Sequence, residues 1–317
     1  MLPVPASQPD AHHDYARPET LPEALSLLAA GGWRLLAGGT DLYPGAGRML
    51  AGPVLDLSGI AELCGISTDA GQQNGGQQTG GHQFGDLRIG AATPWSEIAT
   101  ANLPPALWAL QQAAGQVGGR QIQAAGTLGG NLCNASPAAD GVPPLLALDA
   151  KVELASAHGT RRLALTEFLR GPRQTALHPG EVLVAVLIPE AALSGHSAFV
   201  KLGARSHLVI SIAMVAARVV VTAGRVAEAA IAVGSCSGVA TRLPKVEVAL
   251  QSAPVAEAVA RIMAGDVGDA LSPIDDIRAS GDYRQAAAVE LVRRAVGQAV
   301  AGAIMGANSG SGMGASS

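Results

Sequence analysis

Two glycine-rich segments carry residue types that could bind an anionic ligand through the main chain. The first is Leu35-Leu36-Ala37-Gly38-Gly39-Thr40-Asp41-Leu42, in which an apolar run leads into paired glycines and a hydroxyl group. The second, residues 125–140, contains the pair Gly129-Gly130 together with the short polar residues Thr127, Asn131, Asn134, Ser136 and Asp140. Consecutive glycines allow adjacent N–H groups to point at one centre without obstruction by a Cβ atom. Two such nests could hold a pyrophosphate, with Asp140 accepting from a ribose hydroxyl, so the pair of segments favours a dinucleotide ligand.

Each segment taken alone is also compatible with a purely structural turn, since Gly pairs and Asn/Ser clusters are common in turns and helix caps. The sequence has no Gly-x-Gly-x-x-Gly after a strand and no Gly-x-x-x-x-Gly-Lys-Ser/Thr, which excludes the usual dinucleotide and P-loop signatures. It also has no His-Glu-x-x-His and no Gly-x-Ser-x-Gly. We therefore predict no catalytic acid or base on this chain, and expect a bound cofactor to carry the chemistry.

The cysteines and the charge balance limit the possible metal sites and partners. Cys64, Cys133 and Cys236 form no Cys-x-x-Cys pair, so we predict no metal or iron–sulfur site here and expect all three thiols to be buried. Lys and Arg total 21 against 25 Asp and Glu, a net charge of −4 without a basic block, which argues against nucleic acid. The longest apolar run, 208–221, contains Ser211 and Arg218 and is too short to span a membrane.

The spacing of apolar residues predicts the elements that position the two segments. Thr20 and Glu23 form a capping-box pattern before a helix that ends at Gly31. A short buried strand at 33–37 should enter the first glycine pair, and a helix capped by Thr93 should begin at Pro94. Further strands are expected at 54–57, 87–91, 151–155 and 181–188, and helices at 107–117 and 143–150.

A second unit begins near Ser197. Strands are expected at 199–202, 208–221 and 226–233, followed by helices at 245–263 and 284–304. Strands first and helices afterwards is typical of an α+β fold. Residues 69–85, rich in Gly and Gln without an apolar pattern, should form an exposed loop.

The two glycine-rich segments resemble the paired FAD-binding signatures of the molybdenum hydroxylase flavoprotein subunits, the medium chains of xanthine dehydrogenase, carbon monoxide dehydrogenase and their relatives. The resemblance continues through Gly180-Glu181-Val182-Leu183, through 199–205 (Phe-Val-Lys-Leu-Gly-Ala-Arg), and through 275–284 (Asp-Asp-Ile-Arg-Ala-Ser-Gly-Asp-Tyr-Arg). These segments follow one another in the family's order, and the resemblance extends from about residue 14 to about residue 303.

The resemblance implies an α+β protein with a two-part FAD-binding domain of the vanillyl-alcohol-oxidase type, followed by a smaller α/β domain. The FAD-binding domain would span 14–193, with subdomains 14–68 and 86–193 on either side of the 69–85 loop. The C-terminal domain would span 194–303. Residues 1–13, which lack a signal-peptide pattern, would be a flexible N-terminus, and 304–317 a disordered tail.

The resemblance also implies which residues contact FAD. Amides of the first segment would wrap the pyrophosphate, and residues of the second would form another nest. Asp140 would bind a ribityl or ribose hydroxyl, and Lys201 would lie near the isoalloxazine edge, although a strand lysine in solvent is the alternative. The implied cofactor residues are Leu35, Leu36, Ala37, Gly38, Gly39, Thr40, Asp41, Leu42, Val117, Thr127, Gly130, Asn131, Asn134, Asp140, Leu183 (with Val182) and Lys201.

The implied function is electron relay within a multi-subunit oxidoreductase. A large Mo-pterin subunit and a small [2Fe–2S] subunit would be the partners, as a dimer of heterotrimers, with NAD⁺, oxygen or another acceptor taking the electrons. FAD should be bound non-covalently, because the first segment has no His or Cys, and no [4Fe–4S] cluster is expected on this chain. We expect a cytoplasmic location, or export of the complex on a partner's signal. The alternatives are a stand-alone FAD reductase of the same fold, such as the enolpyruvyl-sugar reductase of cell-wall synthesis, and a nucleotide-binding protein without redox activity.

Overall fold

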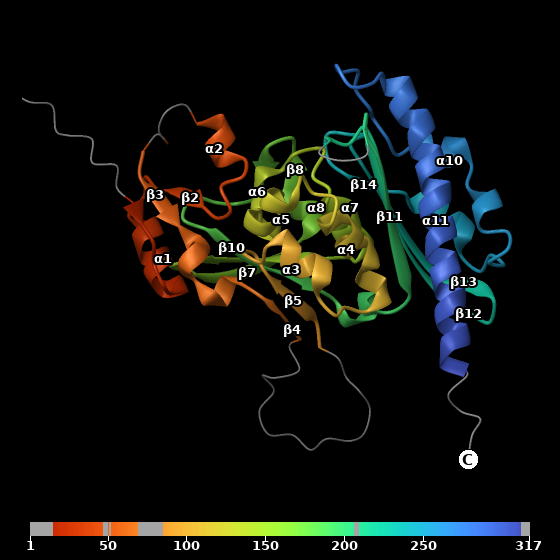
Figure 1. Ribbon diagram of the computed structural model, residues 1–317, viewed down its shortest axis with the longest axis horizontal. Helices are drawn as coiled ribbons and strands as arrows, with labels where there is room; N and C mark the ends of the chain where they lie inside the picture. Colours follow the sequence, from red (N-terminus) through yellow and green to blue (C-terminus); the bar gives the residue numbers. More distant parts are fainter. Residues whose placement is uncertain (1–14, 47–49, 51, 69–84, 206–208, 312–317) are drawn as a thin grey trace, which may run out of the picture.

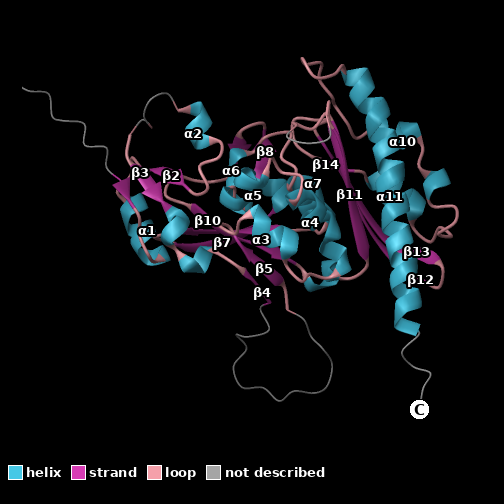
Figure 2. Cartoon of the chain, in the orientation of Figure 1, coloured by secondary structure: helices cyan, strands magenta, loops and turns pink. Residues whose placement is uncertain are grey.

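The computed structural model describes residues 15–46, 50, 52–68, 85–205 and 209–311. The three larger sheets follow one another along the longest axis of the molecule, each accompanied by helices (Figure 1). This mixture of sheets and separate helices confirms the α+β class predicted from the sequence (Figure 2). The predicted loop at 69–85 falls almost entirely outside the described residues, as does the N-terminal segment 1–13.

The first unit is a small parallel sheet in the order β1-β3-β2, formed by Tyr15–Ala16, Val54–Asp56 and Arg34–Leu36. Helix α1 (Leu21–Ala29) packs on this sheet and begins as predicted, with the Thr20 hydroxyl accepting from the Glu23 amide at 3.4 Å. Buried Ala24, Leu28 and Leu55 share a core with Val184 of a later strand, so this unit is not independent of the next. The short helix α2 (Leu42–Gly45) follows β2 after the first glycine pair.

The second unit is a five-stranded antiparallel sheet in the order β4-β5-β10-β6-β7. Its central strand β10 (Val182–Ile188) is buried at every residue, as its near-continuous apolar run predicted. Trp95, Phe168 and Leu132 fill the core between this sheet and its helices. The other strands are Ile66–Thr68 (β4), Leu87–Gly90 (β5), Lys151–Ser156 (β6) and Gly159–Ala164 (β7), and the helices are Trp95–Thr100 (α3), Trp108–Ala114 (α4), Arg120–Ala125 (α5), Leu128–Asn134 (α6), Val142–Ala147 (α7) and Leu165–Phe168 (α8). A two-stranded hairpin of β8 (Leu169–Gly171) and β9 (Gln174–Thr175) follows α8.

The third unit is a four-stranded antiparallel sheet of β11 (His196–Leu202), β12 (Ala213–Thr222), β13 (Arg225–Gly234) and β14 (Thr241–Arg242). The long helix α11 (Gly281–Ser311) crosses one face of this sheet, accompanied by α9 (Pro244–Leu250) and α10 (Ala264–Gly268) (Figure 1). Helices α4 and α7 of the second unit pack on the other face through a cluster that includes Ala113, Phe199 and Met214. The third unit therefore closes against the side of the second.

Several boundaries predicted from the sequence were wrong. The expected helix at 245–263 ends at Leu250, because Pro254 follows within one turn. Helix α3 starts at Trp95 without a side-chain cap, since the Thr93 hydroxyl donates to the Gly65 carbonyl oxygen instead. The tail expected from 304 is helical as far as Ser311, and its Gly/Ser/Ala composition hid this from the pattern.

Candidate functional site

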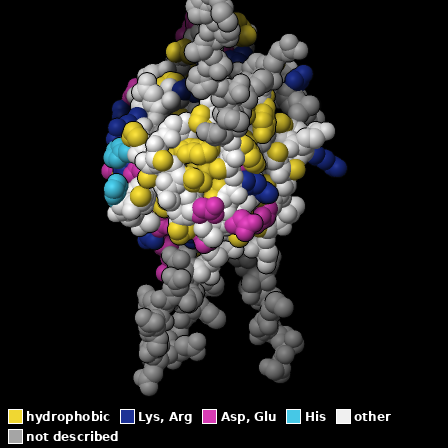
Figure 3. Space-filling view, turned by 90° about the vertical axis from the view of Figure 1, so that its left-hand side faces the viewer, with side chains coloured by type: hydrophobic (Ala, Val, Ile, Leu, Met, Phe, Trp, Pro, Cys, Tyr) yellow, Lys and Arg dark blue, Asp and Glu magenta, His cyan; other side chains and the backbone are white. Residues whose placement is uncertain are grey.

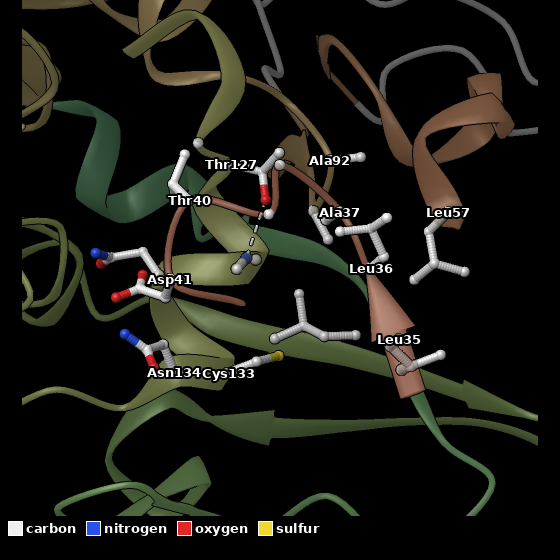
Figure 4. Close-up of a pocket in the computed structure, with 18 of the residues that line it drawn as sticks. Leu35, Leu36, Ala37, Thr40, Asp41, Leu57, Ala92, Thr127, Cys133 and Asn134 are labelled. Atoms are coloured by element: carbon white, nitrogen blue, oxygen red, sulfur yellow. Dashed lines mark hydrogen bonds between the residues drawn. The ribbon is translucent and has the colours of Figure 1, made fainter. Parts of the chain in front are cut away.

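The two glycine-rich segments line one cavity of about 570 Å³, between the first sheet and helix α6 (Figure 4). This volume is within the range of small-molecule and cofactor pockets. Every residue that we predicted to contact the cofactor lies in the wall of this cavity, with the exceptions of Asp140 and Lys201. The segments therefore form one site, as their shared chemistry indicated.

The loop after β2 supplies free hydrogen-bond donors. The amides of Gly38, Gly39, Thr40 and Asp41 have no acceptor among the described residues. Gly39 has φ +69°, a left-handed conformation that favours glycine, and its carbonyl oxygen accepts from the Tyr43 amide at 2.9 Å to close the turn. Unpaired amides grouped in one loop form the type of main-chain nest that binds anions.

Gly38 has a second task besides the amide role that we predicted. A Cβ atom at this position would lie 1.8 Å from the Ala125 carbonyl oxygen and 2.9 Å from the Gly126 Cα atom. The glycine is needed because the two segments cross in direct backbone contact. The loop is thereby held against the end of α5.

Helix α6 contributes side chains and not the second amide nest that we expected at Thr127, Gly130, Asn131 and Asn134. The Thr127 hydroxyl caps the helix by accepting from the Gly130 amide at 3.1 Å, and the Asn131 amide donates to the Thr127 carbonyl oxygen. The amides of Leu128 and Gly129 donate to Thr93 and Ala91. The first turn of α6 therefore has no free amide.

Asn131, one of the lining residues, carries a buried side-chain oxygen that lacks a hydrogen-bond partner among the described residues. Such an atom costs free energy unless a donor reaches it. Asp41 is the one ionisable carboxylate or cation in the described lining, so negative charge on a ligand would have to be met by the amides. A group with both anionic oxygens and N–H or O–H donors, such as FAD, fits these residues.

The rest of the wall is largely apolar, and the sequence did not reveal it. Trp95 is almost fully buried and still contributes to the lining, and Cys133 opens onto the cavity. Although Cys133 is exposed toward the cavity, desolvation by the protein atoms around its thiol raises its pKa to about 12. Lining residues that we had not assigned to the cofactor are Leu57, Leu63, Ala91, Ala92, Trp95, Ile122, Gly126, Cys133 and Leu177. They come from four separate regions of the chain and share no local pattern, although Gly126 and Cys133 lie within the second signature.

The expectation that all three cysteines would be buried was wrong for two of them. Cys64 and Cys133 are exposed, and only Cys236 is buried. Within the described residues no group of three or more His, Cys, Asp or Glu side chains is placed to bind a metal ion.

Asp140 and Lys201 lie beside the cavity and bind each other. Lys201 Nζ is 2.6 Å from Asp140 Oδ2, and the Ser211 hydroxyl donates to Asp140 Oδ1 at 2.7 Å. Burial raises the pKa of Asp140, with Lys201 and Ser211 acting in the opposite direction. Lys201 also reaches the carbonyl oxygen of Gln116, the neighbour of the lining residue Val117. Their predicted contacts with the cofactor stay predictions.

Comparison with known proteins gives the family. Residues 10–191 match the model of the FAD binding domain in molybdopterin dehydrogenase, and residues 198–299 match the CO dehydrogenase flavoprotein C-terminal domain. The chain belongs to the FAD-binding subunits of the molybdopterin dehydrogenases. It is therefore an oxidoreductase subunit of the xanthine dehydrogenase family, as the resemblance implied.

Similar proteins cover almost the whole flavoprotein subunit. The xanthine dehydrogenase FAD-binding subunit of Escherichia coli O157:H7 is 31% identical over 91% of this chain and 96% of its own length. The carbon monoxide dehydrogenase medium chain of Afipia carboxidovorans is 32% identical over the same shares. A structure of quinoline 2-oxidoreductase from Pseudomonas putida 86 superposes with a TM-score of 0.78 at 28% identity, covering 92% of this chain and 98% of that one. No helix in the described part of this subunit is long and apolar enough to cross a membrane.

Proposed function

We propose that this flavoprotein subunit binds FAD non-covalently and relays electrons from the [2Fe–2S] clusters of a partner subunit to NAD⁺, oxygen or another acceptor. The observation that carries the proposal is the group of unpaired amides at Gly38–Asp41, at the wall of a cavity large enough for a flavin. Bound FAD would supply the redox chemistry, because a flavin can accept electrons singly and release them in pairs. The side chains of the cavity would bind and orient it.

The main chain would hold the charged part of the cofactor. The described lining contains no lysine or arginine. The loop amides would donate to the pyrophosphate oxygens in their place. The apolar walls around Leu57, Ala92 and Val182 would take the ring systems. FAD, with its pyrophosphate, should therefore bind more tightly than riboflavin, which has none.

The raised pKa of Cys133 supports non-covalent binding. A protonated thiol is a poor nucleophile, so Cys133 would not attach itself to a flavin ring despite facing the cavity. Cys64 and Cys236 are not among the lining residues. We further propose that no [4Fe–4S] cluster is bound here, since the cysteines lie singly in three regions of the chain.

Partner subunits are part of the proposal. Relatives carry the names "medium chain" and "FAD-binding subunit", which fit a complex with a large Mo-pterin subunit and a small [2Fe–2S] subunit, as a dimer of heterotrimers. Hydrophobic side chains gather in the middle of the end face formed by the first unit, with charged groups mostly toward its margin (Figure 3). Tyr15 and Tyr43 in this unit are more than half exposed, which suits contact with another chain. The cytoplasm is the compartment that we propose for the complex.

Titration of the flavin-free subunit with FAD, FMN and riboflavin, followed by flavin fluorescence, tests the binding site. We expect affinity to fall in that order, and acid precipitation to release all flavin into the supernatant. Equal affinity for FAD and riboflavin would overturn the assignment of the amides to the pyrophosphate. Isolation of the native complex, with molybdenum and iron measured per flavin, tests the partner proposal, and a yellow subunit that purifies alone would contradict it.

A further inference from the structure

Arg173 binds the end of helix α6 although it lies far from the glycine-rich segments in sequence. It is at the tip of the β8–β9 hairpin, with a left-handed φ of +60°. Its amide donates to the Ala135 carbonyl oxygen at 2.8 Å, and its guanidinium donates to the carbonyl oxygen of Asn134 at 3.3 Å. The same Nη1 atom donates to the Asn134 side-chain oxygen. A cation that donates to the last carbonyls of a helix is favourably placed.

The contact between Arg173 and Asn134 determines which atom of the carboxamide is free. A guanidinium carries only donors, so the Asn134 atom that faces it must be the oxygen. The amide nitrogen is then turned away from Arg173, and it makes no hydrogen bond with any described residue. Asn134 is part of the cavity wall, and its side chain lies on the same side of the site as that of Asp41 (Figure 4).

We propose that Arg173 is a positioning residue of the cofactor site, which fixes the Asn134 carboxamide so that its NH₂ group is offered to FAD as a hydrogen-bond donor. This inference rests on the proposed function. Asp41 can only accept while ionised, so a donor on the same side of the cavity would complement it toward a hydroxyl group of the cofactor, which both donates and accepts. Without Arg173 the carboxamide could rotate, and the acceptor oxygen could face the cofactor.

A double-mutant cycle tests whether Arg173 acts through Asn134. We expect Arg173→Ala and Asn134→Ala each to weaken FAD binding to the subunit about tenfold, the size of one well-placed hydrogen bond. The double variant should bind FAD no more weakly than Asn134→Ala alone, since the two changes remove the same interaction. Arg170→Ala is the matched control, because Arg170 lies on the same hairpin, is exposed, and its side chain makes no hydrogen bond with the described residues.

Asn134→Asp gives a second test that keeps the side-chain size and the partner of Arg173. The change replaces the free NH₂ group by an oxygen, so FAD binding should weaken more than in Asn134→Ala, and the visible circular dichroism of bound flavin should change. The positioning role would be overturned if the losses of FAD affinity in the two single variants multiplied in the double variant. It would also be overturned if Arg173→Ala bound FAD normally. A wild-type subunit that binds no FAD would instead overturn the proposed function.

Discussion

Lys201 and Asp140 form an ion pair with 2.6 Å between Nζ and Oδ2, and both side chains are less than one-tenth exposed. Lys201 belongs to β11 of the third unit, whereas Asp140 follows α6 of the second. The pair therefore joins the two units next to the cavity wall at Val117.

Removal of Lys201 from this buried ion pair should lower the stability of the folded protein. Lys201→Ala leaves the Asp140 carboxylate buried with Ser211 alone, and we expect the free energy of unfolding to fall by about 3–5 kcal/mol. Urea denaturation at neutral pH measures this loss. Lys245→Ala is the control, since the Lys245–Asp269 pair has the same 2.6 Å distance but is more than half exposed, so its loss should cost far less stability. Similar losses in both variants would contradict the importance of burial.

Asp276 should make the protein less stable in acid. Burial acts to raise the pKa of Asp276, but the Arg278 amide and the guanidinium groups of Arg284 and Arg278 outweigh it and lower the pKa to about 2. The folded state therefore favours the ionised carboxylate, and this stabilisation is present above the ordinary pKa of 3.8 and lost as the pH falls toward 2. Asp276→Asn should flatten the fall in unfolding free energy over that interval. Glu190→Gln, at an exposed carboxylate without an ion pair among the described residues, should leave the slope unchanged.

Gly38→Ala should damage the proposed FAD site through the backbone. The new Cβ atom would lie 1.8 Å from the Ala125 carbonyl oxygen, so the loop must move away from α5 at a cost of about 1–3 kcal/mol. Flavin bound per chain, measured by absorbance after gel filtration, should fall sharply. Gly45→Ala is the control in the adjacent helix α2, where a Cβ atom would meet nothing within 4 Å. Full flavin content in Gly38→Ala would show that the loop can move away from Ala125 without loss of the cofactor.

Thr127→Ala should affect both stability and cofactor binding. The hydroxyl caps α6 through the Gly130 amide, and removal of an N-cap costs about 1 kcal/mol. Because Thr127 also lines the cavity, we expect weaker FAD binding in the titration described above. Thr20→Ala removes the cap of α1, outside the cavity wall, and should cost similar stability while FAD affinity stays unchanged. An equal loss of affinity in both variants would attribute the effect to general destabilisation.

Features that depend on neighbouring residues could be predicted from the sequence. The Thr20 cap and the buried strand at 182–188 each follow from a few adjacent side chains. The first glycine-rich segment was also identified, because paired glycines after an apolar run are a local signal. Pro254 is an equally local signal that the helix predicted at 245–263 must end before it, and helix α9 ends at Leu250.

Contacts between distant segments could not be predicted in this way. Nothing near Leu57 or Leu177 indicates that they line the same cavity. The sequence could not show that the first amides of α6 are already hydrogen-bonded, since their acceptors Thr93 and Ala91 belong to another segment. The pairing of Asp140 with Lys201, 61 residues away, likewise depends on how the second and third units pack.

The backbone crossing of Gly38 and Ala125 bears on when the cofactor can be acquired. The loop that offers amides without acceptors among the described residues is made early in translation, but the contact that holds it in place is made only when the end of α5 has been synthesised. A nascent chain that ends before Ala125 lacks this support for the loop, so we expect it not to retain FAD. We therefore expect flavin to be inserted only after the synthesis of α5, and products that end before Ala125 to be colourless.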